Sequence, residues 1–347
     1  MRVSRFRRSS GRASRVRNSY QIYRGRYPVG QQFLVVGPGW LGSEVAEALG
    51  GRGSAVWTLQ RSAPPPSSAA SVHPLRGDIR ATGDEATWRR QLPAHLDGIV
   101  VCIAPSRVLG DSHATTYPAA VRGALELAHA CSCPRILYTS STGVYGRTDG
   151  GVSREGDAIV VADARQGALR DAEIVLNADL GGPALDRIIL RVAGLYGPGR
   201  DPAPRFQVSV PAADDDVWCN FAWRDDVVEA ITHLMTTPAV SLPEHASARP
   251  SARPSARVFN CADGVPLRAS RIARALGASE ENASAGAMQR MRPAAAPSGR
   301  SNQQIVVDAL RATGWQPRMT TVYDGLRALG HHVRASDVAA APMPERP

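Results

Sequence analysis

The chain has 347 residues, a hydrophobic fraction of 43% and a formal net charge of +10. This length suits one large α/β domain, and the apolar fraction supplies a sizeable core. No stretch approaches the roughly 18 apolar residues of a membrane-spanning helix, so we expect a soluble, cytoplasmic protein. Its five cysteines form no CxxC pair and no zinc-type spacing, which argues against a metal site and favours a reducing compartment.

The positive charge is concentrated at the N-terminus. Residues 1–32 form an Arg- and Ser-rich arm with nine arginines and no acid, and the first acid is Glu44. Taking nine from the 41 basic residues leaves 32 against 31 acids, a net charge of +1. A nearly neutral remainder argues against a basic nucleic-acid face. The arm fits a disordered tail, a wrongly chosen start codon or an organelle-import segment better than a nucleic-acid contact.

Strand-like and helix-like patterns alternate after the arm. Residues 33–36 predict a strand, and Leu41, Val45, Ala48 and Leu49 then recur at helical spacing. Further strands are predicted at 55–59, 98–105 and 135–141, and within 186–199 and 257–264; helices are predicted from Pro118 onward and over 168–176. This alternation predicts an α/β fold with a doubly wound parallel sheet. The SARPSARPSAR repeat at 247–257 predicts a surface loop, and 331–347 a frayed tail.

The first turn has the pattern of a dinucleotide-binding site. Gly37-Pro38-Gly39-Trp40-Leu41-Gly42 fits GxGxxG between a strand and an amphipathic helix. In such turns the glycines permit a tight bend, close approach to a pyrophosphate and close helix packing. The helix amino terminus then offers free N–H groups to the phosphates. We therefore expect Gly37, Gly39, Trp40, Leu41 and Gly42 to bind the cofactor.

The end of the second predicted strand indicates which nucleotide is bound. NAD sites usually have an acid there that accepts a hydrogen bond from the ribose 2′-hydroxyl. Here Leu59 is followed by Gln60, Arg61 and Ser62. Because an arginine suits a 2′-phosphate, we predict NADP as the cofactor, with NAD as the less favoured alternative.

Several motifs together resemble a known enzyme family. GPGWLG, GDI (77–79), TSSTGVYG (139–146), LRVAGLYGPGR (190–200), NFAWRDDVVEAI (220–231) and VFNCADG (258–264) occur in the order seen in extended short-chain dehydrogenases/reductases, the NAD-dependent epimerase/dehydratase branch. The resemblance covers about residues 33–330. It implies a Rossmann domain with a smaller, discontinuous C-terminal substrate-binding region. By the same resemblance, Asp78 and Ile79 lie near the adenine, and Ala104 and Pro105 near the nicotinamide. Ser140, one of the small hydroxyl residues that end a predicted strand, is a further cofactor-binding candidate.

The family's catalytic set is incomplete in this chain. Family members use a serine or threonine with a YxxxK tyrosine and lysine; Ser141 and the adjacent Thr142 match the hydroxyl position. Arg165 and Leu169 stand where the tyrosine and lysine are expected, and the chain has no lysine at all. Tyr145 and Arg165 are therefore the candidate substitutes. Packing or lining the cavity is the favoured role for Tyr145, and a guanidinium does not usefully give up a proton.

Three classes of function follow, of which the weakest is a nucleic-acid-associated protein that acts through the Arg-rich arm. The favoured one is an oxidoreductase or epimerase with a non-standard active site, acting on a nucleotide sugar or related carbonyl compound. The alternative is a non-catalytic NADP(H)-binding sensor or scaffold. We expect a small-molecule partner rather than a membrane or nucleic acid, and a homodimer is compatible with these features.

Overall fold

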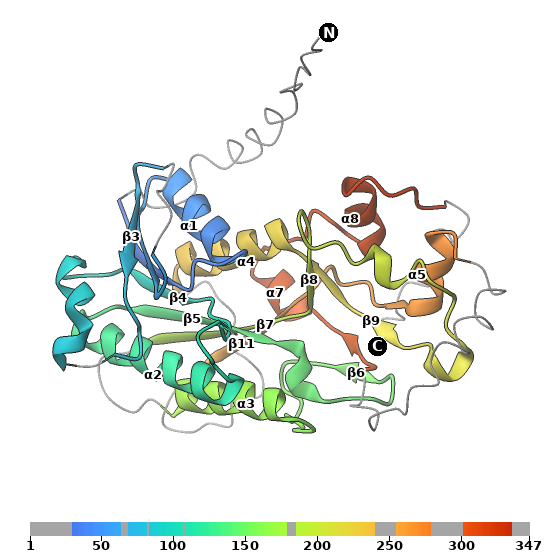
Figure 1. Cartoon of the computed structure of the whole chain (residues 1–347), viewed down its shortest axis with the longest axis horizontal. Helices are drawn as coiled ribbons and strands as arrows, with labels where there is room; N and C mark the ends of the chain where they lie inside the picture. Colours follow the sequence, from blue (N-terminus) through green and yellow to red (C-terminus); the bar gives the residue numbers. More distant parts are fainter. Residues whose placement is uncertain are drawn as a thin grey trace, which may run out of the picture.

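The computed structural model describes residues 30–63, 69–81, 83–106, 108–178, 185–239, 255–278 and 301–334. A seven-stranded parallel sheet in the order β3-β2-β1-β4-β5-β7-β11 forms its centre (Figure 1). The strands are β1 (Gln32–Val36), β2 (Ala55–Gln60), β3 (Val72–Arg76), β4 (Gly98–Val101), β5 (Arg135–Ser141), β7 (Asp186–Val192) and β11 (Arg257–Cys261). The order reverses between β1 and β4, which confirms the predicted doubly wound sheet.

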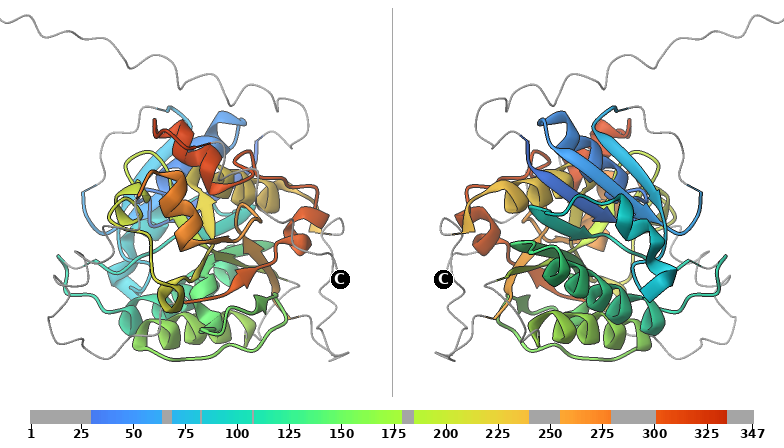
Figure 2. Two further views of the ribbon diagram at one scale, coloured as in Figure 1. Left: turned by 90° about the vertical axis from the view of Figure 1, so that its right-hand side faces the viewer. Right: turned by 90° about the vertical axis from the view of Figure 1, so that its left-hand side faces the viewer.

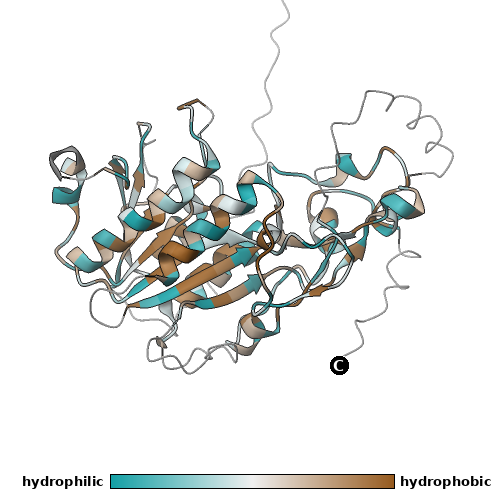
Figure 3. Cartoon of the chain, turned by 90° about the horizontal axis from the view of Figure 1, so that it is seen from below, coloured by the Kyte–Doolittle hydropathy of each residue, from teal (hydrophilic) through white to brown (hydrophobic). Residues whose placement is uncertain are grey.

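Helices cover both faces of this sheet. Helices α1 (Gly42–Gly51) and α4 (Arg224–Thr236) pack together on one face, and α2 (His113–Ala130) and α3 (Ala164–Asn177) on the other (Figures 1 and 2). The strands between them are strongly apolar (Figure 3), and all four residues of β4 are buried. Burial on both faces explains why β4 reads as a continuous apolar run without alternation.

A second, smaller hydrophobic core lies beside the carboxyl ends of the strands. Tyr196, Phe221, Trp223, Ile272 and Leu326 are among its buried residues. Its elements come from separate parts of the chain: β8 (Gly194–Tyr196) pairs with β10 (Phe221–Trp223), β9 (Trp218–Cys219) pairs with β12 (Leu267–Arg268), and α5 (Ala269–Ala275) and α8 (Val322–Ala328) cover them. Sequence-distant segments therefore form one wall against the main sheet.

Short elements join the two cores. β6 (Val152–Ser153) pairs with β13 (Gln304–Ile305), and α7 (Asp308–Ala312) contacts β11. The 3₁₀ helices are η2 (Gly83–Gln91), η3 (Thr142–Tyr145), η4 (Ala203–Arg205) and η5 (Ala213–Asp215). In the part of the chain that the structure describes, no helix combines the length and hydropathy needed to cross a bilayer.

Several element predictions need correction. The strand predicted over 98–105 ends at Val101, and the helix predicted over 168–176 begins at Ala164. Helix α2 begins at His113, five residues before Pro118, because Ser112 caps it by accepting from the Thr115 backbone N–H at 3.1 Å. The helix tolerates Pro118 in its second turn at the cost of one backbone hydrogen bond. The sequence pattern also missed β3, whose Pro74 is unusual for a strand but acceptable at a sheet edge. Residues 1–29, most of the 247–257 repeat and residues 335–347 lie outside the described residues.

Candidate active site

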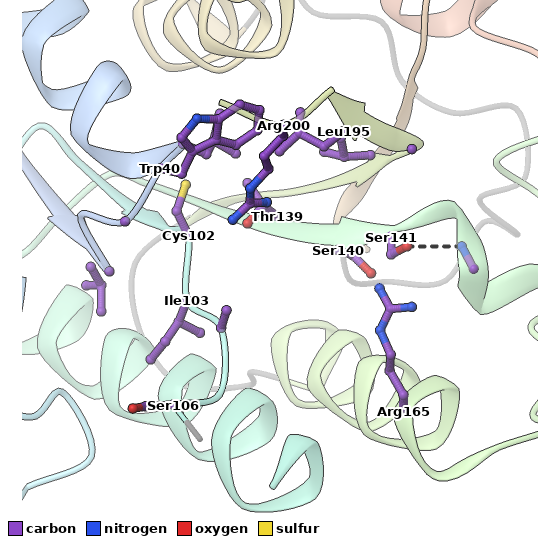
Figure 4. A pocket seen from close by; sticks show the side chains of 18 of the residues that line it. Trp40, Cys102, Ile103, Ser106, Thr139, Ser140, Ser141, Arg165, Leu195 and Arg200 are labelled. Atoms are coloured by element: carbon purple, nitrogen blue, oxygen red, sulfur yellow. Dashed lines mark hydrogen bonds between the residues drawn. The ribbon is translucent and has the colours of Figure 1, made fainter. Parts of the chain in front are cut away.

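A cavity of about 1530 Å³ opens at the carboxyl ends of the strands. The turn after β1 and the segment after β4 form one side, where the strand order reverses. The end of β5 and the amino end of α3 extend the cavity, and the smaller core closes it (Figure 4). Open α/β sheets bind ligands in this crevice.

The Gly-rich turn leaves space for a phosphate group. Gly37 has φ +83°, and a Cβ there would lie 2.8 Å from the Cys102 carbonyl oxygen. At Gly42 a Cβ would lie 2.3 Å from the Gly37 carbonyl oxygen, so this glycine lets α1 pack against the turn. At Gly39 a Cβ would meet nothing within 4 Å. The open space beside Gly39 at the amino end of α1 fits a dinucleotide pyrophosphate.

Two arginines flank Trp40 in the same turn. The guanidinium carbons of Arg200 and Arg224 lie 4.3 Å and 5.2 Å from the centre of the indole ring. The indole Nε1 donates to the Pro198 carbonyl oxygen at 3.0 Å. Arg224 is also paired with Glu44 at 3.0 Å, whereas Arg200 lines the cavity. Trp40 therefore connects the Gly-rich turn to the loop after β8, and it packs against Arg200, whose positive charge lies at the cavity wall.

Ion pairs stabilise the end of the cavity near β2. Both terminal nitrogens of Arg61 donate to the Asp111 carboxylate. The same carboxylate also accepts a hydrogen bond from the Ser106 backbone N–H at 2.9 Å. The hydrogen bonds from Arg61 hold the pKa of Asp111 well below its usual range. Burial favours a higher pKa for Asp78, but hydrogen bonds from Arg80 outweigh it and lower that pKa. Neither carboxylate is therefore an unpaired acceptor for a ribose hydroxyl.

Two adjacent serines at the end of β5 present opposite hydrogen-bonding properties to the cavity. Ser141 Oγ accepts from the Gly143 backbone N–H at 3.2 Å (Figure 4), which leaves its own proton free to donate. Ser140 Oγ donates its single proton to Glu173 Oε1 at 2.6 Å, so its oxygen can only accept from a ligand. Glu173 is buried and paired with Arg191 at 2.7 Å. The site therefore has one donor and one acceptor side by side.

Arg165 lies opposite these serines. It is the second residue of α3, it is exposed, and its guanidinium points toward Ser140 and Ser141 (Figure 4). Burial raises the pKa of the Tyr117 hydroxyl, and the charge and hydrogen bond of Arg165 partly offset this effect. Leu169, one turn further along α3, is buried. The helix thus presents a permanent positive charge to this part of the cavity.

Tyr145 does not share the cavity with the other candidate catalytic residues. The 3₁₀ turn of η3 directs its side chain into the core, where its hydroxyl donates to Asn260 Oδ1 at 2.7 Å. The Arg191 guanidinium carbon lies 4.9 Å from the centre of the Tyr145 ring. Burial raises the pKa of the Tyr145 hydroxyl to about 12. Ser141, Thr142 and Arg165 line the cavity, so the structure brings together three of the four.

The cofactor candidates are placed in a similar way. Gly37, Gly39, Trp40, Leu41, Arg61, Asp78, Ile79, Ala104 and Ser140 line the cavity, whereas Gly42 and Pro105 do not. Gly42 acts through packing, as above, and the cavity wall continues past Pro105 at Ser106. Sequence reasoning missed the opposite wall, which consists of Arg200, Arg205, Trp218, Asn220, Phe221, Ser301 and Gln303. Among the described residues, no group of three His, Cys, Asp or Glu side chains is placed to hold a metal ion.

Comparison with known proteins gives consistent matches. The model of the NAD dependent epimerase/dehydratase family matches residues 33–246. Protein YeeZ of Escherichia coli K12 is 34% identical over 212 residues, which is 60% of this chain and 74% of YeeZ. A solved structure from Methylobacillus flagellatus, described as an NAD-dependent epimerase/dehydratase, has a TM-score of 0.62 and 25% identity, covering 86% of this chain and 97% of its own. MoeE5 in complex with UDP-glucose and NAD has a TM-score of 0.62 and 21% identity, covering 85% of this chain and 96% of its own, and shares the fold.

Proposed function

Because the chain belongs to the NAD-dependent epimerase/dehydratase family, we propose that it is an NADP(H)-dependent oxidoreductase that acts on a carbonyl compound. One observation carries the proposal: a single cavity joins the Gly37–Gly42 turn to Ser141 and Arg165. Its volume of about 1530 Å³ exceeds the roughly 300–1,000 Å³ of a site for one small ligand. It therefore has room for a dinucleotide and a substrate together.

The residues present fit a nicotinamide dinucleotide. Gly39 leaves space for the pyrophosphate, and Asp78 and Ile79 line the part of the cavity in which we propose that the adenine binds. When bound, the dinucleotide supplies the hydride chemistry. NADP is favoured over NAD because Arg61 and Arg76 line the end near β2, and because Asp78, the one acid among the described residues of the cavity wall, is paired with Arg80.

Side chains of this protein are suited to carbonyl reduction. Ser141 has a free proton to donate to the carbonyl oxygen, and Arg165 supplies positive charge beside the alkoxide that develops there. Among the described residues, no carboxylate or imidazole lines this end of the cavity, and burial raises the pKa of the Cys102 thiol, which lies beside Trp40, to about 12. Reduction takes its proton from solvent, whereas alcohol oxidation needs a base. We therefore place reduction ahead of epimerisation, which requires both directions.

A nucleotide sugar is the first substrate class to test, because MoeE5 was solved with UDP-glucose and NAD. Steady-state NADPH oxidation is measured with nucleotide-sugar and small carbonyl substrates. We expect Ser141→Ala to reduce turnover by about tenfold or more through loss of one donor to the developing charge. Tyr145→Phe is the control, because it also removes one hydroxyl group but lies outside the cavity. We expect it to leave turnover per folded molecule nearly unchanged. Fast alcohol oxidation near pH 7, or full activity in Ser141→Ala, contradicts the proposal.

The second candidate function is a non-catalytic NADP(H) sensor or scaffold. It is favoured by the orientation of Tyr145, whose hydroxyl is bonded to Asn260 inside the core. Calorimetry distinguishes the two functions when combined with the turnover assay. Tight NADPH binding without turnover of any carbonyl substrate supports the sensor.

A further inference from the structure

The charges lining the cavity are strongly unequal. Five arginines (Arg61, Arg76, Arg165, Arg200 and Arg205) and one acid, Asp78, form part of its wall. Near β2, Arg61 is paired with Asp111 and Asp78 with Arg80. At the opposite end, beside Ser141, the charge of Arg165 has no carboxylate partner among the described residues. This end of the cavity therefore has an uncompensated positive charge at the position of the reaction.

Nearby acids do not neutralise Arg165. Glu173 is buried, and its two oxygens are occupied by Ser140 and Arg191. Asp163, the N-cap residue of α3, accepts from the Gln166 backbone N–H at 2.7 Å. A guanidinium remains charged at every physiological pH. Arg165 has a hydrogen bond with the neutral Tyr117 hydroxyl, which does not balance its charge, so an anion brought by a ligand can still pair with it.

Resting on the proposed function, we propose that the substrate carries a carboxylate directly beside the reacting carbonyl, as in a 2-oxo acid. The planar fork of a guanidinium matches the two oxygens of a carboxylate, and one positive charge balances one negative charge. Arg165 and Ser141 face the same part of the cavity (Figure 4). Arg165 thus binds the carboxylate while Ser141 donates to the adjacent carbonyl oxygen.

The reaction that follows is balanced. A hydride adds to the carbonyl carbon, the C=O double bond becomes a single bond, and a proton from solvent is added to the oxygen. When bound, the reduced nicotinamide cofactor would supply this hydride, and the 2-oxo acid would become a 2-hydroxy acid. The carboxylate takes no part in bond changes, so Arg165 acts as an anchor that orients the substrate.

Binding of oxamate, a 2-oxo acid isostere, tests the inference without requiring turnover. Its neutral diamide, oxamide, is the matched ligand, and Arg170→Gln is the matched variant: Arg170 lies on the same helix, pairs with its neighbour Asp171 and is not part of the cavity wall. In calorimetric titrations with and without NADPH, we expect Arg165→Gln to weaken oxamate at least tenfold, while Arg170→Gln has no effect. The inference is overturned if oxamate binds the wild type no more tightly than oxamide does. It is also overturned if oxamate binds Arg165→Gln as tightly as it binds the wild type.

A second measurement separates this inference from the proposed function. Hydroxypyruvate and hydroxyacetone differ by the carboxylate, and we expect at least a tenfold higher kcat/KM for the acid, lost in Arg165→Gln. NADPH-dependent reduction of both at equal efficiency, together with oxamate binding that ignores Arg165, contradicts the carboxylate anchor and leaves the oxidoreductase in place. Arg165-dependent oxamate binding without any NADPH oxidation contradicts the oxidoreductase and leaves the anion site in place.

Discussion

Arg61 lies just past the end of β2, with its two terminal nitrogens on the Asp111 carboxylate. A 2′-phosphate carries more charge than a carboxylate and competes with Asp111 for this fork. We expect NADPH to bind about tenfold tighter than NADH, and Arg61→Ala to remove most of the difference, since a charge-assisted contact contributes about 1.5–3 kcal/mol. Titration calorimetry with both cofactors checks this, with Arg170→Ala as the charge-matched control. Equal affinities in the wild type contradict the NADP assignment.

Single residues could be predicted from sequence where a local motif defines them. Gly37, Gly39 and Ser141 belong to contiguous patterns, and all three line the cavity. Asp111 could not be predicted, because its pairing with Arg61 spans 50 residues. The orientation of Tyr145 also depends on a distant partner, Asn260, which is 115 residues away. Motifs identify which residues are present, whereas tertiary contacts decide which of them face a ligand.

At the scale of elements, a buried ion pair joins α3 to the sheet. Glu173 of α3 pairs with Arg191 of β7 at 2.7 Å, and both side chains are at most 5% exposed. The same carboxylate accepts from Ser140 at the end of β5. These contacts hold α3 against the ends of β5 and β7, next to the serines. Long-range polar contacts of this kind are not visible in the helical apolar pattern from which α3 was predicted.

We expect Glu173→Gln to destabilise the protein by about 3–5 kcal/mol, because the buried Arg191 then loses its counter-charge. The free energy of unfolding in urea measures the effect. The double variant Glu173→Leu, Arg191→Met removes both charges and is expected to recover most of the loss. A loss below about 1 kcal/mol in the single variant would show that the pair contributes little to docking of α3.

Element order was predictable because apolar strands and amphipathic helices alternate along the chain. The errors arise where tertiary position overrides local preference. Pro74 is accepted in β3 because that strand is the sheet edge. The Ser112 cap starts α2 five residues before Pro118, so the helix carries this proline in its second turn and loses one backbone hydrogen bond there. The smaller core could be predicted only as a region, since its strands are two or three residues long and pair across distant segments.

For the whole molecule, the N-terminal arm holds almost all of the excess charge. The described contacts begin at Gly30, whose backbone N–H donates to the Gly53 carbonyl oxygen at 3.3 Å, and at Gln31, whose carbonyl oxygen accepts from Ala55. Removing residues 1–29 keeps both contacts and takes away nine arginines. We therefore expect the truncated protein to keep its melting temperature and, within about twofold, its NADPH affinity, since the cofactor contacts proposed above begin at Gly37.

The same truncation tests whether the arm contacts nucleic acid. Binding through arginines weakens steeply with salt, because it depends on release of counterions from phosphates. With a net charge of +1 left, the truncated protein is expected to show no salt-dependent retention on duplex DNA in a filter-binding titration, whatever the full chain does. Retention that survives the truncation would place a nucleic-acid site on the folded part. A melting temperature lowered by more than about 4 °C, which is roughly 3 kcal/mol of stability for a chain of this size, would show that the arm packs on the domain and that its charge is not independent of the fold.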